Sequence, residues 1–115
     1  MPNVNVQVQT TGGGIHKVTI NPERLRIPPQ AKDVVITWKA AGPTTFLSGK
    51  DGFSWLDTGT PNVRQVDPNT FESDKFDNPS TGKTPIVWRY LIGVEEGGVK
   101  IQIDPEVDND PPLGP

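Results

Sequence analysis

The 115-residue chain has no cysteine, one histidine and one methionine, which is its first residue. The absence of cysteine excludes disulfides, thiolate nucleophiles, iron–sulfur clusters, and zinc–thiolate or blue-copper sites. No apolar run reaches the 18 residues of a membrane-spanning helix, so we expect no membrane insertion. The N-terminal residues do not follow the pattern of a secretory signal peptide, which favours the cytoplasm. We expect the histidine, His16, at the edge of the core, because it shares a strand face with Val18 and Ile20.

Clustered positive charge is also absent. The chain has 11 basic and 14 acidic residues, a formal net charge of -3, and only Arg24 and Arg26 lie close together among its scattered basic residues. Proteins that bind nucleic acid use clustered Lys and Arg to displace counterions from phosphates. The sequence therefore predicts no nucleic-acid partner.

Short segments in which apolar and polar residues alternate run through the chain, and this is the pattern of half-buried β-strands. These segments are 4–8, 15–20, 24–27, 34–39 and 99–103, and short apolar pieces lie at 45–47 and 53–56. Segment 86–94 is largely apolar on both faces, so we expect it to be a central strand. No segment carries a helical apolar stripe, and the 12 Gly and 13 Pro suit a fold with many turns. We predict an all-β fold, a two-sheet antiparallel sandwich, with Trp38 and Trp88 near the centre of its core.

The predicted domain organisation is one sandwich domain over residues 1–103, followed by a tail over residues 104–115. The tail is rich in acids and prolines, so we expect it to be extended and partly mobile. We expect a monomer or a weak dimer, the dimer formed if an exposed edge strand, such as Val4–Val8, pairs with a second copy.

Residues 57–84 are mostly polar and rich in turn-forming residues. Val63 and Val66 suggest one weak strand there, and Phe71 and Phe76 are expected to pin this stretch to the core. A structureless loop of this length is uncommon in a compact domain, so the segment should contain short elements.

Two parts of the chain resemble a known family. The run Ile20–Ile27, followed by Val34–Trp38, is similar to the early strands of cupredoxins, in which an apolar-x-Pro entry leads to a strand ending in Val-x-Trp. Trp88–Tyr90, with the hairpin to Val99–Ile101, resembles the last two strands of that family. The resemblance implies a cupredoxin-like sandwich, and an immunoglobulin-like sandwich remains the alternative.

The copper chemistry that the resemblance implies is not supported by the residues present. A blue-copper site takes two His and one Cys, usually with a weak Met. Where the family has its first His, this chain has Pro43–Phe46; where it has Cys, this chain has Leu91–Ile92; and the ligand loop is reduced to Glu95–Gly98. We therefore predict a cupredoxin-like β-sandwich that lacks the copper ligands and carries no metal and no cofactor.

One segment is a candidate ligand-binding site. Phe53 and Trp55 share one strand face and are flanked by Asp51 and Asp57, an arrangement that would allow a sugar ring to stack on the aromatic side chains. Paired aromatic residues more often belong to the core, because they bury so much apolar area.

The remaining motifs favour ordinary structural roles. Thr81–Thr84 reads like the end of a phosphate-binding loop, but Asp77 stands where that motif needs glycine, so a surface turn is favoured. Four alternating acids in the tail have oxygen ligands suited to calcium, although a solvated acidic tail explains them better. These acids are Asp104, Glu106, Asp108 and Asp110.

The sequence does not specify a function. We predict a non-enzymatic binding or structural module without metal, whose partner is an unknown protein or a polysaccharide. The alternative is a carbohydrate-binding module that uses the aromatic platform. A hydrolase that uses two carboxylates is the third and least favoured hypothesis, because nothing singles out a pair of acids.

Overall fold

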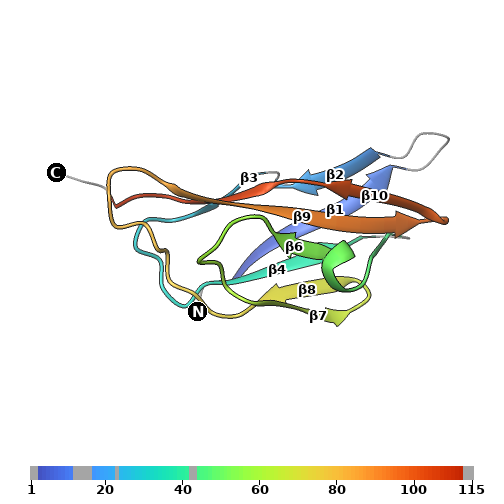
Figure 1. Cartoon of the computed structure of the whole chain (residues 1–115), viewed down its shortest axis with the longest axis horizontal. Coiled ribbons are helices and arrows are strands. Elements are labelled where there is room, and N and C mark those ends of the chain that lie inside the picture. The colour runs from blue at the N-terminus through green and yellow to red at the C-terminus, as the bar shows by residue number, and fades with distance from the viewer. Residues whose placement is uncertain (1–2, 12–16, 23, 42–43, 113–115) are drawn as a thin grey trace.

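Two β-sheets pack against each other in an elongated molecule that measures 52 × 24 × 23 Å (Figure 1). The computed structural model describes residues 3–11, 17–22, 24–41 and 44–112. The predicted all-β, two-sheet architecture is confirmed. His16 lies outside the described residues, so its predicted place at the core edge stays a prediction.

The first sheet has five strands in the order β2-β1-β4-β8-β7. Their bounds are β1 Asn3–Thr11, β2 Lys17–Asn21, β4 Val35–Ala40, β7 Val63–Asp67 and β8 Thr70–Ser73. The second sheet has the order β10-β9-β11-β3, and β5 and β6 also pair with β9. Its strands are β3 Arg24–Ile27, β5 Thr45–Phe46, β6 Phe53–Trp55, β9 Ile86–Glu96, β10 Val99–Ile103 and β11 Glu106–Asn109. A 3₁₀ turn, η1, spans Gly49–Asp51.

Both sheets are mixed, so the prediction of strictly antiparallel sheets is wrong. β1 runs parallel to β4, and β3 runs parallel to β11. The chain leaves the first sheet after β2, forms β3 in the second sheet and returns to the first sheet as β4. Two parallel neighbouring strands need a crossover connection of this kind. The alternation of apolar residues along a single strand does not reveal such a connection.

β1 is an inner strand, which corrects the expectation that Val4–Val8 forms an exposed edge. Its residues 3–8 pair with β4, and its residues 7–11 pair with β2 on the other side. Val6 and Val8 are fully buried. The outermost strands are instead β2 and β7 in the first sheet and β10 and β3 in the second.

The core lies between the sheets and contains both predicted tryptophans. Trp38 is fully buried and Trp88 is 3% exposed. The Trp38 indole Nε1–H donates a hydrogen bond of 3.0 Å to the hydroxyl of buried Tyr90, which links β4 of one sheet to β9 of the other. Burial raises the pKa of Tyr90, so its hydroxyl stays neutral.

Part of the predicted C-terminal tail is a strand within the second sheet, which corrects the tail's boundary at residue 104. β11 pairs antiparallel with β9 on one side and parallel with β3 on the other. Val107 is fully buried, and the alternating Glu106 and Asp108 form ion pairs with Arg24. The sequence predicts a tail because this segment contains several acids and prolines and only one apolar strand residue, Val107. In the fold, Glu106 and Asp108 form ion pairs with Arg24 on the neighbouring strand β3.

The polar segment 57–84 contains the short elements that were expected. β7 and β8 form an antiparallel pair with an irregularity between Gln65 and Asp67, and Phe71 is buried. Phe76 is partly buried, and its backbone forms hydrogen bonds with Val34 in both directions. The weak strand was therefore correctly located.

Candidate functional site

The predicted aromatic pair belongs to the core more than to the surface. Phe53 is 8% exposed, and its ring lies 4.7 Å from Trp38 and 5.1 Å from Tyr90 between ring centroids. β6 places it there by pairing antiparallel with the central strand β9. Phe53 therefore has almost no surface to offer a ligand.

Trp55 is partly exposed but held in place on several sides. Its indole Nε1–H donates a hydrogen bond of 2.8 Å to the Pro61 carbonyl, and its ring lies 5.7 Å from both Trp88 and Tyr90. A hydrogen-bonded and edge-packed indole is rigid, so its exposed part presents a fixed apolar patch.

Asp57 ends the pairing of β6 with β9. Its carboxylate accepts a hydrogen bond of 2.7 Å from the Arg89 backbone N–H and also binds the Arg89 guanidinium at 3.2 Å. These two hydrogen bonds from Arg89 lower the pKa of Asp57. The Asp57 carboxylate thus replaces the next strand residue as a hydrogen-bond partner, which is a structural role.

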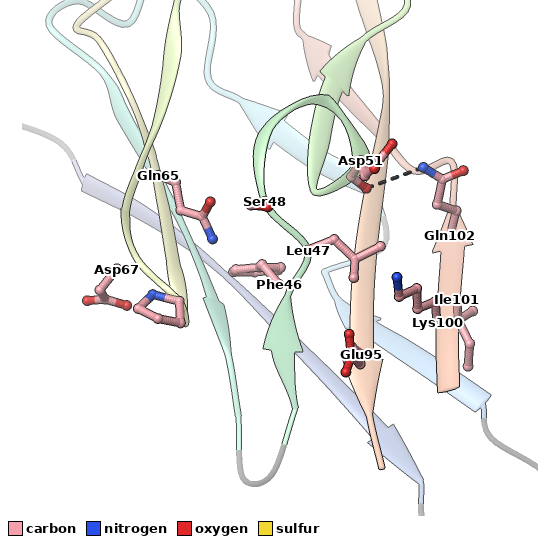
Figure 2. Close-up of a pocket in the computed structure, with 11 residues that line it drawn as sticks. Phe46, Leu47, Ser48, Asp51, Gln65, Asp67, Glu95, Lys100, Ile101 and Gln102 are labelled. Carbon is pink, nitrogen blue, oxygen red and sulfur yellow. Dashed lines mark hydrogen bonds between the residues drawn. The ribbon is translucent and has the colours of Figure 1, made fainter. Parts of the chain in front are cut away.

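Asp51 belongs to a different place, an open groove of about 880 Å³ at one end of the sandwich (Figure 2). The groove is lined by side chains from β5 and the residues after it, the β7 end, β9 and β10. They are Phe46, Leu47, Ser48, Asp51, Gln65, Asp67, Pro68, Glu95, Lys100, Ile101 and Gln102. The structure therefore separates Asp51 from the other three residues of the predicted site.

A glycine on β9 allows η1 to lie against this strand and carry Asp51. The Gly93 N–H donates to the Gly52 carbonyl at 2.9 Å, and the Leu47 N–H donates to the Gly93 carbonyl at 3.0 Å. A Cβ atom at position 93 would lie 2.0 Å from the Asp51 backbone oxygen, which no side chain can accommodate. The absence of a side chain at Gly93 thus sets the position of one groove wall.

Most groove residues carry polar side chains, and acids outnumber bases. Asp51, Asp67 and Glu95 contribute three carboxylates to the lining, and Lys100 contributes the single ammonium group. One oxygen of Asp67 accepts the Asn69 backbone N–H at 2.8 Å. The excess of negative charge suits a ligand that brings positive charge or many hydroxyl donors.

Two amide side chains and several apolar residues also line the groove. The Gln102 Nε2 donates a hydrogen bond of 3.3 Å to the Asp51 backbone oxygen, as the dashed line in Figure 2 marks. Gln65 lies across the groove on β7, and Leu47 and Ile101 are partly buried. The groove thus offers hydrogen bonds of both kinds beside a small apolar surface.

The acids of the C-terminal segment include Glu106, which pairs with basic residues across the second sheet. In the strand register, Glu106 lies opposite both Arg24 and Arg89, and Arg89 binds Asp57. Acidic and basic side chains therefore alternate across the outer face of this sheet. Glu106 lies 2.7 Å from the Arg24 guanidinium. Among the residues that the structure describes, no group of three or more His, Cys, Asp or Glu could hold a metal ion.

Asp108 is the buried member of this acidic segment. Its side chain is 8% exposed, one carboxylate oxygen lies 3.2 Å from the Arg24 Nε, and the other accepts no hydrogen bond from the described residues. Removal from water raises the pKa of Asp108, and the neighbouring Glu106 adds to this effect, while Arg24 opposes it. Among the described residues, the carboxyl groups with displaced pKa values are those of Asp57 and Asp108, and both lie outside the groove.

Thr81–Thr84 is an exposed turn that leads into strand β9. A phosphate-binding loop must open a helix, so this context supports the surface-turn interpretation.

Sequence reasoning found Asp51 but missed the rest of the groove. Gln65 and Asp67 come from β7, whereas Glu95, Lys100 and Gln102 come from the β9–β10 hairpin, and none of the five stands in a recognisable motif. The hairpin is a local feature, but only the tertiary structure brings β7 and Asp51 to it, so no local signal for the complete groove was available.

Within the described part of the chain, no helix is long and apolar enough to cross a membrane. Comparison with known proteins found no match to any family model, curated protein or solved structure.

Proposed function

We propose that this protein is a non-catalytic binding module whose ligand occupies the groove at the β5, β7 and β10 end of the sandwich. The observation that carries this proposal is the groove itself, about 880 Å³ in volume and lined by charged, amide and apolar side chains from four parts of the chain. Ligand sites commonly combine such a concave shape with a few convergent polar groups.

The charge balance of the groove favours a basic ligand, and we propose an extended peptide segment that carries Arg or Lys. Asp51, Asp67 and Glu95 would pair with its cationic groups, while Leu47 and Ile101 would contact the aliphatic stems. A single exposed charge pair at 4 Å contributes about 1 kcal/mol in water, or roughly fivefold in affinity. Binding should therefore weaken as salt is raised.

The test is a titration of isotope-labelled protein, followed by NMR, with short basic, neutral and acidic peptides and with neutral oligosaccharides. The basic peptide should shift the signals of groove residues, and Glu95→Gln should weaken its binding roughly fivefold. Glu72→Gln is the matched control: it changes the net charge equally, but Glu72 is outside the groove and binds Arg64. No binding by the basic peptide, or equal effects of the two variants, would refute the proposal.

We also propose that the sandwich is cupredoxin-like and works without copper or another cofactor. The order of the strands supports this proposal, since β1 lies beside β4 and the chain visits the second sheet between them. Leu91 and Ile92, which stand where that family has its cysteine, lie within β9 and carry no group that binds copper. Copper titration should give no intense visible charge-transfer band.

A second candidate function is carbohydrate binding on an aromatic platform. The partial exposure of Trp55 and its rigid mounting favour it, but burial of Phe53 leaves a platform of one ring. Affinity electrophoresis on a panel of polysaccharides tests it: retardation that Trp55→Ala abolishes would support this function, and unchanged mobility on every polysaccharide would exclude it.

A further inference from the structure

The free edge of β10 forms a regular surface at the end of the second sheet. β10 is the outermost strand of that sheet and pairs only with β9 among the described strands. Two other outermost strands carry features that discourage further pairing. β3 has four residues and lies between Pro22 and Pro28, and β7 is irregular between Gln65 and Asp67. β10 contains neither a proline nor an irregularity.

The hairpin geometry determines which backbone groups β10 directs outward. Gly97 and Gly98 have φ values of 58° and 81°, which correspond to a two-residue type I′ turn. In such a hairpin the flanking residues, Glu96 and Val99, exchange hydrogen bonds, and every second residue after them does the same. The N–H and C=O groups of Lys100 and Gln102 therefore point away from β9, toward the free edge.

The inward face of β10 is only partly covered. Val99 is 39% exposed, and Ile101 and Ile103 pack against the core while remaining partly exposed. An additional strand along this edge would cover these three apolar side chains and satisfy the outward backbone groups together.

We propose that the occupant of this edge is a second copy of the chain, paired antiparallel through β10 with Ile101 on the two-fold axis. This register places Lys100 opposite the second copy's Gln102 and Val99 opposite the second copy's Ile103. No like charges then face each other, and the apolar side chains pack in pairs.

The other registers that match the outward backbone groups are less favourable. Centring the pair on Lys100 sets two ammonium groups directly opposite each other, which is repulsive. Centring it on Gln102 draws Asp104 into the pairing, close to Glu106, where β11 already pairs with β3. The charges and the sheet itself therefore select the register centred on Ile101.

The dimer rests on the strand edge and does not depend on a ligand in the groove. It would nonetheless bring the second copy's Gln102 beside Lys100, at the rim of the groove. The interface is short, so the dimer is weak and forms only at high protein concentration.

Sedimentation velocity from 10 µM to 1 mM tests the association. The wild-type chain should shift from monomer toward dimer across this range. Lys100→Pro removes an outward N–H without breaking the pairing with β9, and by symmetry it removes two intermolecular hydrogen bonds, so the dissociation constant should rise about tenfold or more. Lys100→Gln retains the N–H and should still dimerise, and circular dichroism verifies the fold of both variants. A chain that stays monomeric at 1 mM, or a Lys100→Pro variant that dimerises like the wild type, overturns the proposal.

Cross-linking tests the register, and the absence of native cysteine makes it specific. Ile101→Cys places two thiols at directly opposite, non-hydrogen-bonded positions, where the Cα atoms are close enough for a disulfide. Val99→Cys is the matched control, because it lies on the same face but opposite Ile103 of the second copy. Mild oxidation should cross-link Ile101→Cys much faster than Val99→Cys, and equal rates would refute this register.

Discussion

Asn78 joins three separate chain segments, and its replacement by Asp gives a sharp test of the structure. Asn78 is buried, with 8% of the residue exposed. Its Nδ2 group donates to the carbonyl oxygens of Ile27 at 3.2 Å, Pro28 at 2.8 Å and Asp110 at 2.9 Å, while its Oδ1 accepts the Ser80 N–H at 2.8 Å. Asn78→Asp keeps the shape but replaces the donor with an oxygen that faces three carbonyls.

The expected cost follows from these contacts. Two N–H donors are lost, although the carbonyls of Ile27 and Pro28 still accept the backbone N–H groups of Asp110 and Ala31. The Asp110 carbonyl loses the Asn78 donor, and a carbonyl left without a partner costs about 1–3 kcal/mol. The ionised carboxylate adds the penalty of an unpaired buried charge, so Asn78→Asp should lower the free energy of unfolding by about 3–5 kcal/mol at pH 7. Asn78→Ala, which removes the same donors but buries no charge, should cost less.

The pH dependence of the Asn78→Asp variant has a defined sign. Burial beside carbonyl oxygens must raise the pKa of the new carboxyl group above its unfolded value of about 3.9. The destabilisation is therefore largest at neutral pH and decreases as the pH falls through the folded-state pKa, where the protonated acid regains one donor. Urea denaturation at pH 7 and pH 4 measures both quantities.

Asn62→Asp is the control, because Asn62 is exposed in the loop before β7. This variant should change the free energy of unfolding by no more than about 0.5 kcal/mol. If Asn78→Asp cost no more than Asn62→Asp at neutral pH, the hydrogen bonds assigned to Asn78 would be wrong.

Three further substitutions have effects that the structure defines. Asp57→Asn weakens the hydrogen bonds to Arg89, which lower the pKa of Asp57. The wild type should therefore be more stable than this variant at neutral pH. The difference should disappear as the pH falls below about 4, where the Asp57 carboxylate becomes protonated. Burial raises the pKa of the Asp108 carboxyl group, and Asp108→Asn removes this group. The stability of the variant relative to the wild type should therefore increase as the pH rises through the pKa of Asp108. Thermal unfolding across pH 3–8 measures both. Gly93→Ala forces a Cβ atom to within 2.0 Å of a backbone oxygen of η1 and should cost about 3 kcal/mol or more, whereas Gly82→Ala meets nothing within 4 Å and should be tolerated.

The Asp57 and Asp108 variants must change the pH profile in opposite directions, so parallel shifts would contradict the assigned causes. Equal melting temperatures for Gly93→Ala and Gly82→Ala would contradict the close approach of η1 to β9.

Strand positions and core faces were predictable from the sequence because they depend on local alternation. Val34, Ile36 and Trp38 were assigned to one core-facing side, and each is at most 1% exposed. The hairpin at Gly97–Gly98 was predictable because two adjacent glycines readily adopt positive φ values.

The pairing of strands was not predictable in the same way. Val4–Val8 has the alternation of a half-buried strand whether it lies inside a sheet or at its edge, and the segment Glu106–Asn109 has too few apolar residues to be recognised as a strand. Both were placed by neighbours distant in the sequence: β4 beside β1, and β3 and β9 beside β11.

The core-facing residues of the main strands follow from local sequence, because side-chain direction in a strand alternates with a period of two. The tertiary structure alone decided that Asp51 joins Glu95 and Lys100 at a groove, while Trp55 and Asp57 turn to structural partners. The β9–β10 hairpin is local, but the segments that carry Asp51, Gln65 and Asp67 reach it only through contacts between distant parts of the chain, and these contacts leave no pattern within any single segment.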